Sequence, residues 1–224
     1  MELPFTADQF LNLFREYNTA IWPAQIAAYL LGFAAVFLTH RKEIRLKKSI
    51  LAILGIFWIW MGGLYHLMFF STINGAAYLF GAFFILQGVL FLFAGAGRRQ
   101  PEFEFMFRND AYGWTGSLFI LYAVLIYPVI GSLLGHSYPQ APLFGVAPCP
   151  TTIFTFGILL WTRGRVPGWL LVIPTLWSIV GFLAALRLGI REDIGLLVAG
   201  LVGAAMLLYR NRHQAQKRMT PSPG

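Results

Sequence analysis

The chain has 224 residues, of which 58% are hydrophobic, 17% aromatic and 12% charged, and its formal net charge is +8. This apolar fraction exceeds what a soluble domain of this length can bury, so the composition excludes an ordinary soluble protein and favours a membrane protein. The basic residues lie in short loops between apolar runs, which indicates membrane topology and argues against nucleic acid as a partner. The single cysteine, Cys149, excludes an internal disulfide.

The first 19 residues precede any apolar run that is long enough to cross a membrane. Their apolar side chains fall close to helical spacing, with polar residues between them: Leu3, Phe5, Phe10, Leu13 and Phe14. This pattern predicts a short interfacial helix over residues 1–19. The segment also lacks the basic start of a cleavable signal peptide, so we expect the first span to act as the insertion signal.

Seven apolar stretches follow, judged against the roughly 20 residues that cross a hydrocarbon core. They are Ala20–Thr39, Ser49–Phe70, Asn74–Ala96, Trp114–Leu134, Thr151–Thr162, Trp169–Leu186 and Ile194–Tyr209. We therefore predict an all-α integral membrane protein with seven transmembrane helices. The transmembrane domain covers residues 20–209, and a basic flexible tail covers residues 210–224.

The fifth stretch is the shortest, because a helix over Thr151–Thr162 is only about 18 Å long at 1.5 Å per residue. Two alternatives explain how it fits a bilayer. Either Leu143–Ala147 completes the crossing, or Pro139–Pro150 re-enters the membrane as non-helical backbone, which is tolerated only where protein or a watery cavity satisfies its polar groups. The sequence therefore predicts a short or re-entrant fifth span.

The charges of the loops predict the orientation. Alternate loops and the C-terminal tail carry all of the 17 basic residues except Arg15, Arg187 and Arg191, each of which has an acidic residue nearby. Since Lys and Arg collect in short cytoplasmic loops, this places the N-terminus outside and the C-terminus inside.

The unusual polar residues fall near the outer ends of these spans. We predict that they form a substrate-binding site that opens outward: Trp22, Gln25, Tyr65, His66, Asn74, His136, Tyr138, Cys149, Thr151 and Thr152. The stretch Gly135–Trp161 is the centre of this group, because it combines a histidine, four prolines, the cysteine and a Thr pair. A random distribution would place such residues at both membrane faces.

Each of the reactive residues has a structural alternative. His66 lies within a span, where an ionisable group is costly, so it could be a metal ligand, a proton carrier, a hydrogen-bond donor or a neutral packing residue. His136 fits a solvated turn as well as a site. Cys149, between Pro148 and Pro150, could be a helix N-cap thiolate or a small residue of a Pro-rich turn.

Neither a metal nor a cofactor is predicted. His66, His136 and Cys149 lack the close spacing of zinc ligands, and the common nucleotide, hydrolase and redox motifs are missing from the sequence. The last span has no lysine for a retinal Schiff base. The predicted partners are membrane lipid and a small solute, and a homo-oligomer is an open alternative.

Three segments in order, YNTAIWPAQ, LYHLMFFSTINGAAYLFGA and GHSYPQAPLFGVAPCPTTIFTFG, carry a family resemblance. Together they resemble an uncharacterised family of bacterial multi-pass membrane proteins, defined only as a domain of unknown function. The resemblance spans nearly the whole chain and implies a bacterial inner-membrane location. It brings neither an activity nor catalytic residues.

Three classes of function fit these observations. The first is a transporter or channel for a small solute, with an outward-facing polar vestibule. The second is a membrane-embedded enzyme or redox protein that uses Cys149 with a histidine, and the third is a sensor or structural subunit. The sequence favours the first class and leans away from an enzyme.

Overall fold

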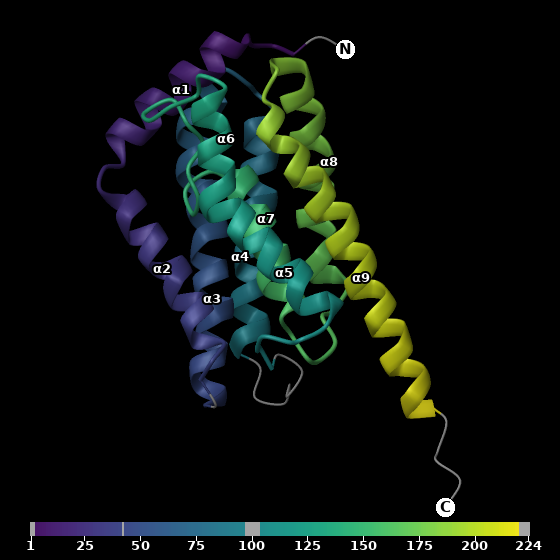
Figure 1. The fold of residues 1–224 in the computed structure, drawn as a ribbon. Helices are drawn as coiled ribbons and strands as arrows, with labels where there is room; N and C mark the ends of the chain where they lie inside the picture. Colours follow the sequence, from purple (N-terminus) through teal and green to yellow (C-terminus); the bar gives the residue numbers. More distant parts are fainter. Residues whose placement is uncertain (1–2, 42, 97–103, 220–224) are drawn as a thin grey trace, which may run out of the picture.

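The computed structural model describes residues 3–41, 43–96 and 104–219, which form a bundle of helices (Figure 1). In chain order the elements are α1 (Ala7–Ala20), α2 (Ala24–Leu38), α3 (Ile44–Trp60), the π-helical η1 (Met61–Phe69), the short η2 (Phe70–Thr72), α4 (Ala77–Ala96), α5 (Ala111–Leu121), the π-helical η3 (Tyr122–Ile126), α6 (Tyr127–Leu133), α7 (Pro148–Leu160), α8 (Trp169–Leu188), the short η4 (Arg191–Asp193) and α9 (Ile194–Met219).

The lengths and composition of these helices agree with an all-α chain suited to a membrane. In the described ranges, five continuous helices are long and apolar enough to cross one: Lys48–Thr72, Ala77–Ala96, Ala111–Leu133, Trp169–Leu188 and Arg191–Gln216. The bent pair α1 and α2 makes a sixth candidate, and α7 is a shorter apolar helix. Each predicted span therefore coincides with a helix, but α2 and α7 are each shorter than a helix that spans a membrane.

The chain begins with α1, which coincides with the helix predicted before the first span. Thr6 caps it, because its hydroxyl accepts from the backbone N–H of Gln9 while the Gln9 side chain accepts from the backbone N–H of Thr6. The chain then turns by 86° between α1 and α2. At the other end of the chain, α9 continues through Arg210 to Met219, well into the predicted tail, and residues 220–224 lie outside the described part.

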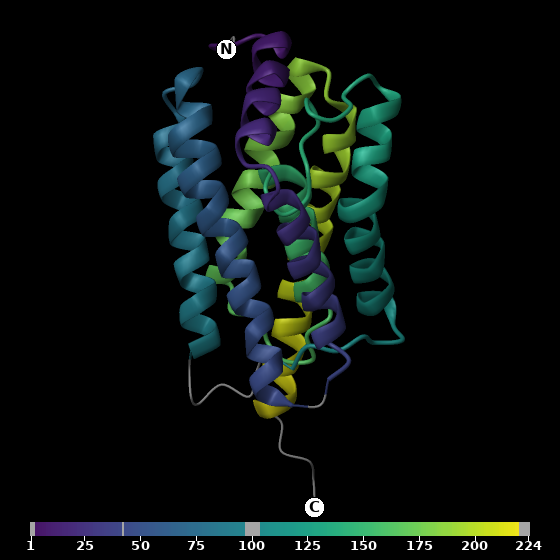
Figure 2. The ribbon, with the colours of Figure 1, turned by 90° about the vertical axis from the view of Figure 1, so that its left-hand side faces the viewer.

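Helix α3 and its continuation η1 lie beside α4 and approach it closely at two glycine pairs (Figure 2). A Cβ atom at Gly62 would lie 2.8 Å from the carbonyl oxygen of Gly81, and one at Gly55 would lie 3.0 Å from that of Gly88. Small residues of this kind let backbones touch, which is how helices pack where lipid removes the hydrophobic driving force.

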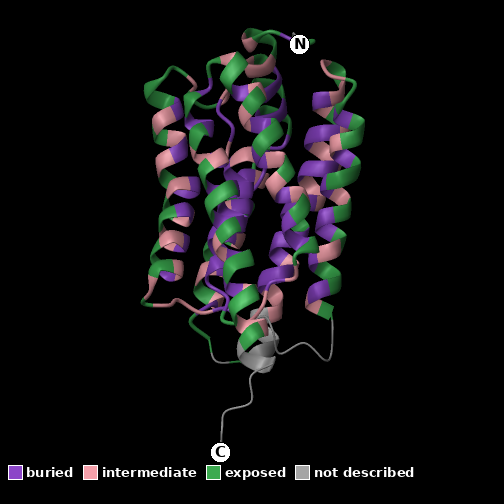
Figure 3. Cartoon of the chain, turned by 90° about the vertical axis from the view of Figure 1, so that its right-hand side faces the viewer, coloured by how far each residue is buried: buried purple, intermediate pink, exposed green. Residues whose placement is uncertain are grey.

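Helix α7 is the centre of the bundle, in contact with α3, α5, α8 and α9 (Figure 3). All of its residues are buried except Cys149, which is partly buried. The helix begins at Pro148 with Ala147 as its N-cap, so of the two alternatives for Cys149 the N-cap position is wrong. Proline fits the first helical position because its missing N–H would have no partner there. Cys149 therefore lies within the first turn.

The segment before α7 is non-helical backbone that is largely buried in the bundle. Side chains of α1 satisfy its polar groups. The Tyr17 hydroxyl donates to the carbonyl of Val146 at 2.9 Å, and the Asn18 amide donates to the carbonyls of Pro139 and Ala141 at 2.7 and 2.8 Å. Partners from protein are what non-helical backbone needs at membrane depth, and both alternatives for how this segment fits a bilayer stay open.

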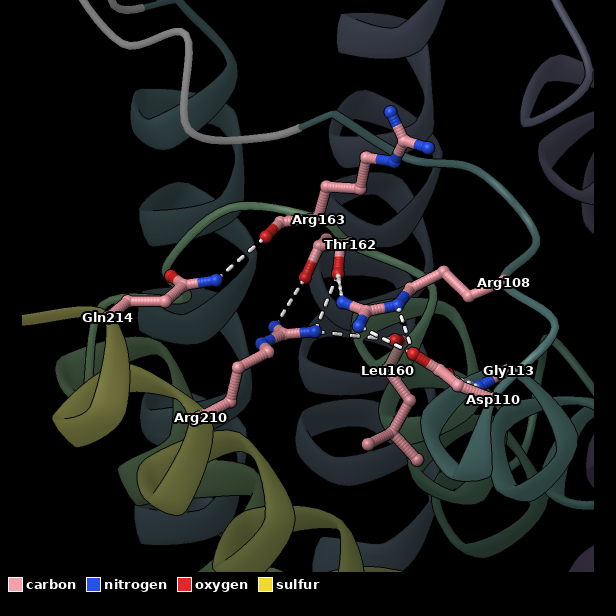
Figure 4. A network of polar contacts seen from close by, with 8 residues as sticks. All are labelled: Arg108, Asp110, Gly113, Leu160, Thr162, Arg163, Arg210 and Gln214. Carbon is pink, nitrogen blue, oxygen red and sulfur yellow. Dashed lines mark hydrogen bonds and ion pairs between the residues drawn. The ribbon is translucent and has the colours of Figure 1, made fainter. Parts of the chain in front are cut away.

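The other end of α7 is held by a polar network (Figure 4). The guanidinium of Arg210, on α9, donates to the carbonyl and the hydroxyl of Thr162 at 2.5 and 2.6 Å. Arg108 pairs with Asp110, and its guanidinium also reaches the Thr162 carbonyl at 3.4 Å. A cation at a helix C-terminus stabilises the unpaired carbonyl groups, so this network fixes the lower end of α7.

Asp110 also caps α5, since its Oδ1 accepts from the N–H of Gly113 at 3.0 Å. Partial burial acts to raise the pKa of Asp110, but the Gly113 N–H and the Arg108 guanidinium outweigh it and hold this pKa below its ordinary value. Because the folded-state pKa is lowered, the charge of Asp110 stabilises the protein above the unfolded-state pKa. That stabilisation is lost as the pH falls through the folded-state pKa.

The glycine contact gives a first prediction from two adjacent residues. Gly62→Ala places a methyl group against backbone of α4, whereas Gly63 has nothing within 4 Å of the same atom. We expect Gly62→Ala to lower the free energy of unfolding by about 1–3 kcal/mol through overpacking. Gly63→Ala is the control and should leave it unchanged or slightly raised. Thermal unfolding in detergent measures both, and equal melting temperatures would contradict the close approach.

A second prediction concerns Asp110. Asp110→Asn keeps an N-capping side chain and removes only the charge, so it should melt below the wild type at pH 7, by a difference that narrows as the pH is lowered toward 3. Asp110→Ala also removes the cap and should cost about 1 kcal/mol at both pH values. The check is a series of melting temperatures against pH. A gap between wild type and Asp110→Asn that widens at low pH would refute the sign.

Candidate functional site

A cavity of about 480 Å³ lies at the end of the bundle where the chain begins. Its walls come from α1, η1, η2, α4, the first turn of α7, α8 and η4, so segments from the whole length of the chain meet there (Figure 1). The lining is mainly apolar, and several of its aromatic rings pack on one another. Phe14 stacks on Tyr65 at 5.2 Å between ring centroids, and Tyr65 stacks on Phe70 at 5.6 Å.

The polar part of the cavity is a small group of side chains around Asp193. The hydroxyl of Tyr127 donates to Asp193 Oδ1 at 2.7 Å. The thiol of Cys149 interacts electrostatically with the Asp193 carboxyl, and the indole nitrogen of Trp177 has no hydrogen-bond partner among the described atoms. Asp193 is 3% exposed, and all four residues line the cavity. A carboxyl group therefore stands in an apolar cavity with uncharged partners.

The neighbouring acid, Glu192, has a different environment. Its side chain is fully buried, and its Oε1 lies 3.1 Å from Nδ1 of His136. Its backbone carbonyl accepts from the Tyr122 hydroxyl at 2.7 Å. Glu192 thus ties the start of the 135–147 loop to the connection between α8 and α9. The two adjacent acids therefore have different surroundings: Glu192 contacts the loop, and Asp193 lines the cavity.

His66 lies behind the cavity wall, within the π-helical turns of η1. It is fully buried among aromatic rings, and its ring centroid is 4.6 Å from that of Phe84 and 5.2 Å from that of Trp177. Neither ring nitrogen has a hydrogen-bond partner among the described atoms. Single π-helical turns are frequent at functional sites. Through Trp177, His66 is one side chain away from the Cys149 thiol.

The predicted site residues divide into three groups. The structure brings Tyr65, Asn74 and Cys149 together in the cavity wall, with His66 directly behind it. Four others support the backbone near the cavity: Gln25, which donates to the Asn18 carbonyl; His136, which pairs with Glu192; and Thr151 and Thr152, whose hydroxyls donate to carbonyls one turn back. Trp22 and Tyr138 are 59% and 53% exposed and lie away from the cavity.

Four further residues line the cavity that the sequence did not predict there: Asp193, Tyr127, Trp177 and Arg187. In the sequence, Glu192 and Asp193 are the acidic residues near Arg187 and Arg191. One signal was available: the two acids directly precede a long apolar run, where the first turn of a helix enters the protein interior. Burial of either acid could not be inferred from that position alone.

Metal ligands do not converge in the described part of the chain, where His, Cys, Asp and Glu form no group of three or more that could hold an ion. At the cavity, Asp193 and Cys149 offer only two side chains of the kind that ligate metals. Glu192 and His136 contact each other at a separate place. The chemistry that this arrangement offers is hydrogen bonding and charge, set within an apolar enclosure.

Comparison with known proteins gives one match. No curated protein and no solved structure is similar enough to be matched. A family model described as a family of unknown function, DUF6064, matches residues 7–218, which covers the elements from α1 to α9 except the last residue of α9. This agrees with the resemblance to an uncharacterised family that the three sequence segments carry. The chain belongs to the family of unknown function DUF6064.

Proposed function

We propose that this chain is an integral protein of the bacterial inner membrane, with seven spans, its N-terminus outside and its C-terminus inside. Five long apolar helices support this proposal. Large apolar side chains on the surface of the bundle also support it, such as Leu30, Phe93 and Leu133, which are 63%, 70% and 82% exposed. Lipid would cover that surface. The bent α1–α2 pair and the protein-enclosed α7 supply the other two spans.

The distribution of charge supports the orientation. Arg108, Arg163 and Arg210 come from three separate segments and lie together at the end opposite the cavity (Figure 4). Basic residues collect on the cytoplasmic side. The cavity then belongs to the outer half of the protein.

We infer that the protein is a carrier for a small, largely apolar molecule. The observation that carries this proposal is the cavity, because its volume of about 480 Å³ and its apolar walls with few polar groups are typical of small-molecule sites. Below it, buried aromatic side chains such as Trp58, Phe84 and Phe154 fill the interior. A filled interior favours a carrier that opens to one side at a time over an open channel.

Irregular helix segments flank the cavity and favour a moving part. The π-helical η1 contains Tyr65, and the π-helical η3 ends directly before Tyr127. Such segments interrupt regular α-helical hydrogen bonding and are frequent where helices bend or bind ligands. Both of these tyrosines line the cavity, so motion at either segment would reshape it.

A membrane enzyme is the second candidate, and the position of Cys149 favours it. The only thiol of the chain faces the cavity next to a carboxyl group. The two candidates differ in what Cys149→Ala does. A carrier should keep its binding and flux in this variant, whereas a thiol enzyme should lose turnover.

A third prediction tests access to the cavity, with Cys149 as the reporter. N-ethylmaleimide should alkylate it in purified protein in nanodiscs, as followed by intact mass. Ala184→Phe fills the cavity and should slow alkylation by about tenfold. Ala27→Phe is the matched control on the exposed side of α2 and should react like the wild type. Equal rates in all three proteins would show that the reagent does not pass through the cavity.

A fourth prediction concerns sidedness and motion. A membrane-impermeant methanethiosulfonate with a trimethylammonium group should modify Cys149 rapidly from the outer face of vesicles. A carrier should also react slowly from the inner face, because the cavity opens there part of the time. Reaction from the outer face alone would contradict a carrier and indicate that the protein is a receptor. Reaction from the inner face alone would reverse the proposed topology.

Two exposed positions calibrate this experiment in a Cys149→Ala background. Tyr138→Cys, in the exposed part of the 135–147 loop, should react only from outside. His213→Cys, near the end of α9, should react only from inside.

A further inference from the structure

We propose that the cavity binds a small organic cation, an ammonium group on an apolar body, with Asp193 as its counter-ion. This inference rests on the proposed binding function and names the chemical class of the ligand. It depends on three features of the described residues: a buried carboxyl group without a cationic partner, a lining of aromatic rings, and the place of the one arginine in the lining.

The carboxyl group of Asp193 is the first feature. The hydroxyl of Tyr127 donates to it, the thiol of Cys149 is an electrostatic neighbour, and both are uncharged, while the histidine of this region pairs with Glu192. A carboxylate this deeply buried is costly unless a cation accompanies it. Neither neighbour supplies that charge. A bound ammonium group would supply it at the point where the cavity is most polar.

The aromatic lining is the second feature. Eight aromatic rings line the cavity together with Asp193: Phe5, Phe10, Phe14, Tyr65, Phe70, Phe80, Tyr127 and Trp177. Some of these rings also pack on one another, as Phe5 does on Phe70 at 5.4 Å between centroids. The faces of aromatic rings attract cations, and cages of such rings are typical binding sites for quaternary ammonium groups.

The position of Arg187 is the third feature. It lies near the end of α8 and is exposed to the surroundings, whereas Asp193 is buried. Solvent and salt screen an exposed charge far more than a buried one. Of the two charged groups in the lining, Asp193 is therefore the one whose charge is less screened. An anionic amphiphile held by Arg187 is the alternative that the experiment must distinguish.

The probe is benzyltrimethylammonium, which carries a permanent charge and a single ring. Neopentylbenzene has the same shape with carbon in place of nitrogen, and benzylsulfonate carries the opposite charge. Each is tested for protection of Cys149 from N-ethylmaleimide in purified protein in nanodiscs. The measured quantity is the concentration that halves the alkylation rate, relative to the same variant without probe.

We expect benzyltrimethylammonium to protect Cys149 at a concentration at least about tenfold lower than that of either analogue. Asp193→Asn keeps an acceptor for the Tyr127 hydroxyl and should raise the half-protective concentration of the cation by a similar factor. It should leave that of neopentylbenzene unchanged. Glu16→Gln, which removes an exposed acid from α1, and Glu192→Gln, which alters the adjacent acid, should both keep the preference for the cation.

Equal protection by the cation and by neopentylbenzene, unaffected by Asp193→Asn, would overturn the cation site while leaving the cavity as a binding site. Preferential protection by benzylsulfonate that is lost in Arg187→Gln would overturn it in favour of an anionic ligand. Alkylation that none of the three compounds slows would contradict the proposed binding function itself. Melting temperatures of the variants confirm that each is folded.

Discussion

The burial of α7 on all sides is the constraint on which the rest of the structure depends. A charged side chain on a helix buried in this way would be costly, and its polar side chains need hydrogen-bond partners within the protein. The hydroxyls of Thr151, Thr152 and Thr155 therefore donate to carbonyl groups of their own helix. Helices α3, α5, α8 and α9 surround α7 and contact it. At Gly157 the approach is so close that a Cβ atom would lie 2.9 Å from the carbonyl of Gly116 on α5.

The shortness of α7 has a direct consequence for function. The helix is about 20 Å long at 1.5 Å per residue, less than a hydrocarbon core of about 30 Å, so the level above its N-terminus must be filled by something else. Part of that level is the non-helical 135–147 loop, held by Tyr17 and Asn18, and part of it is the cavity. Cys149 faces the cavity because it lies in the first turn of a helix that begins inside the protein. The site is thus a product of how the fold fills the space above a short central helix.

Helices and their order were predictable because hydrophobic length and loop charge are local properties of a sequence. The importance of Gly135–Trp161 was also predictable, since prolines, a cysteine and threonines in an apolar chain signal backbone that departs from a plain helix. The site was predictable only in part. Tyr65, Asn74 and Cys149 do meet, but Trp22 and Tyr138 lie outside, because a position near one end of a span does not fix which side of the helix a residue takes.

By itself the sequence determined a helical chain, its apolar segments, the asymmetry of its basic residues and the unusual character of the segment before α7. The tertiary structure alone decided that Asp193 is a buried carboxyl group and that Tyr127 and Cys149 are its neighbours. The physical reason is that burial of an acid beside a loop depends on how η4 and the start of α9 pack against α6 and α7. Those contacts join residues that are 66 positions apart in the case of Tyr127 and Asp193, and no local pattern of hydrophobicity or charge encodes them.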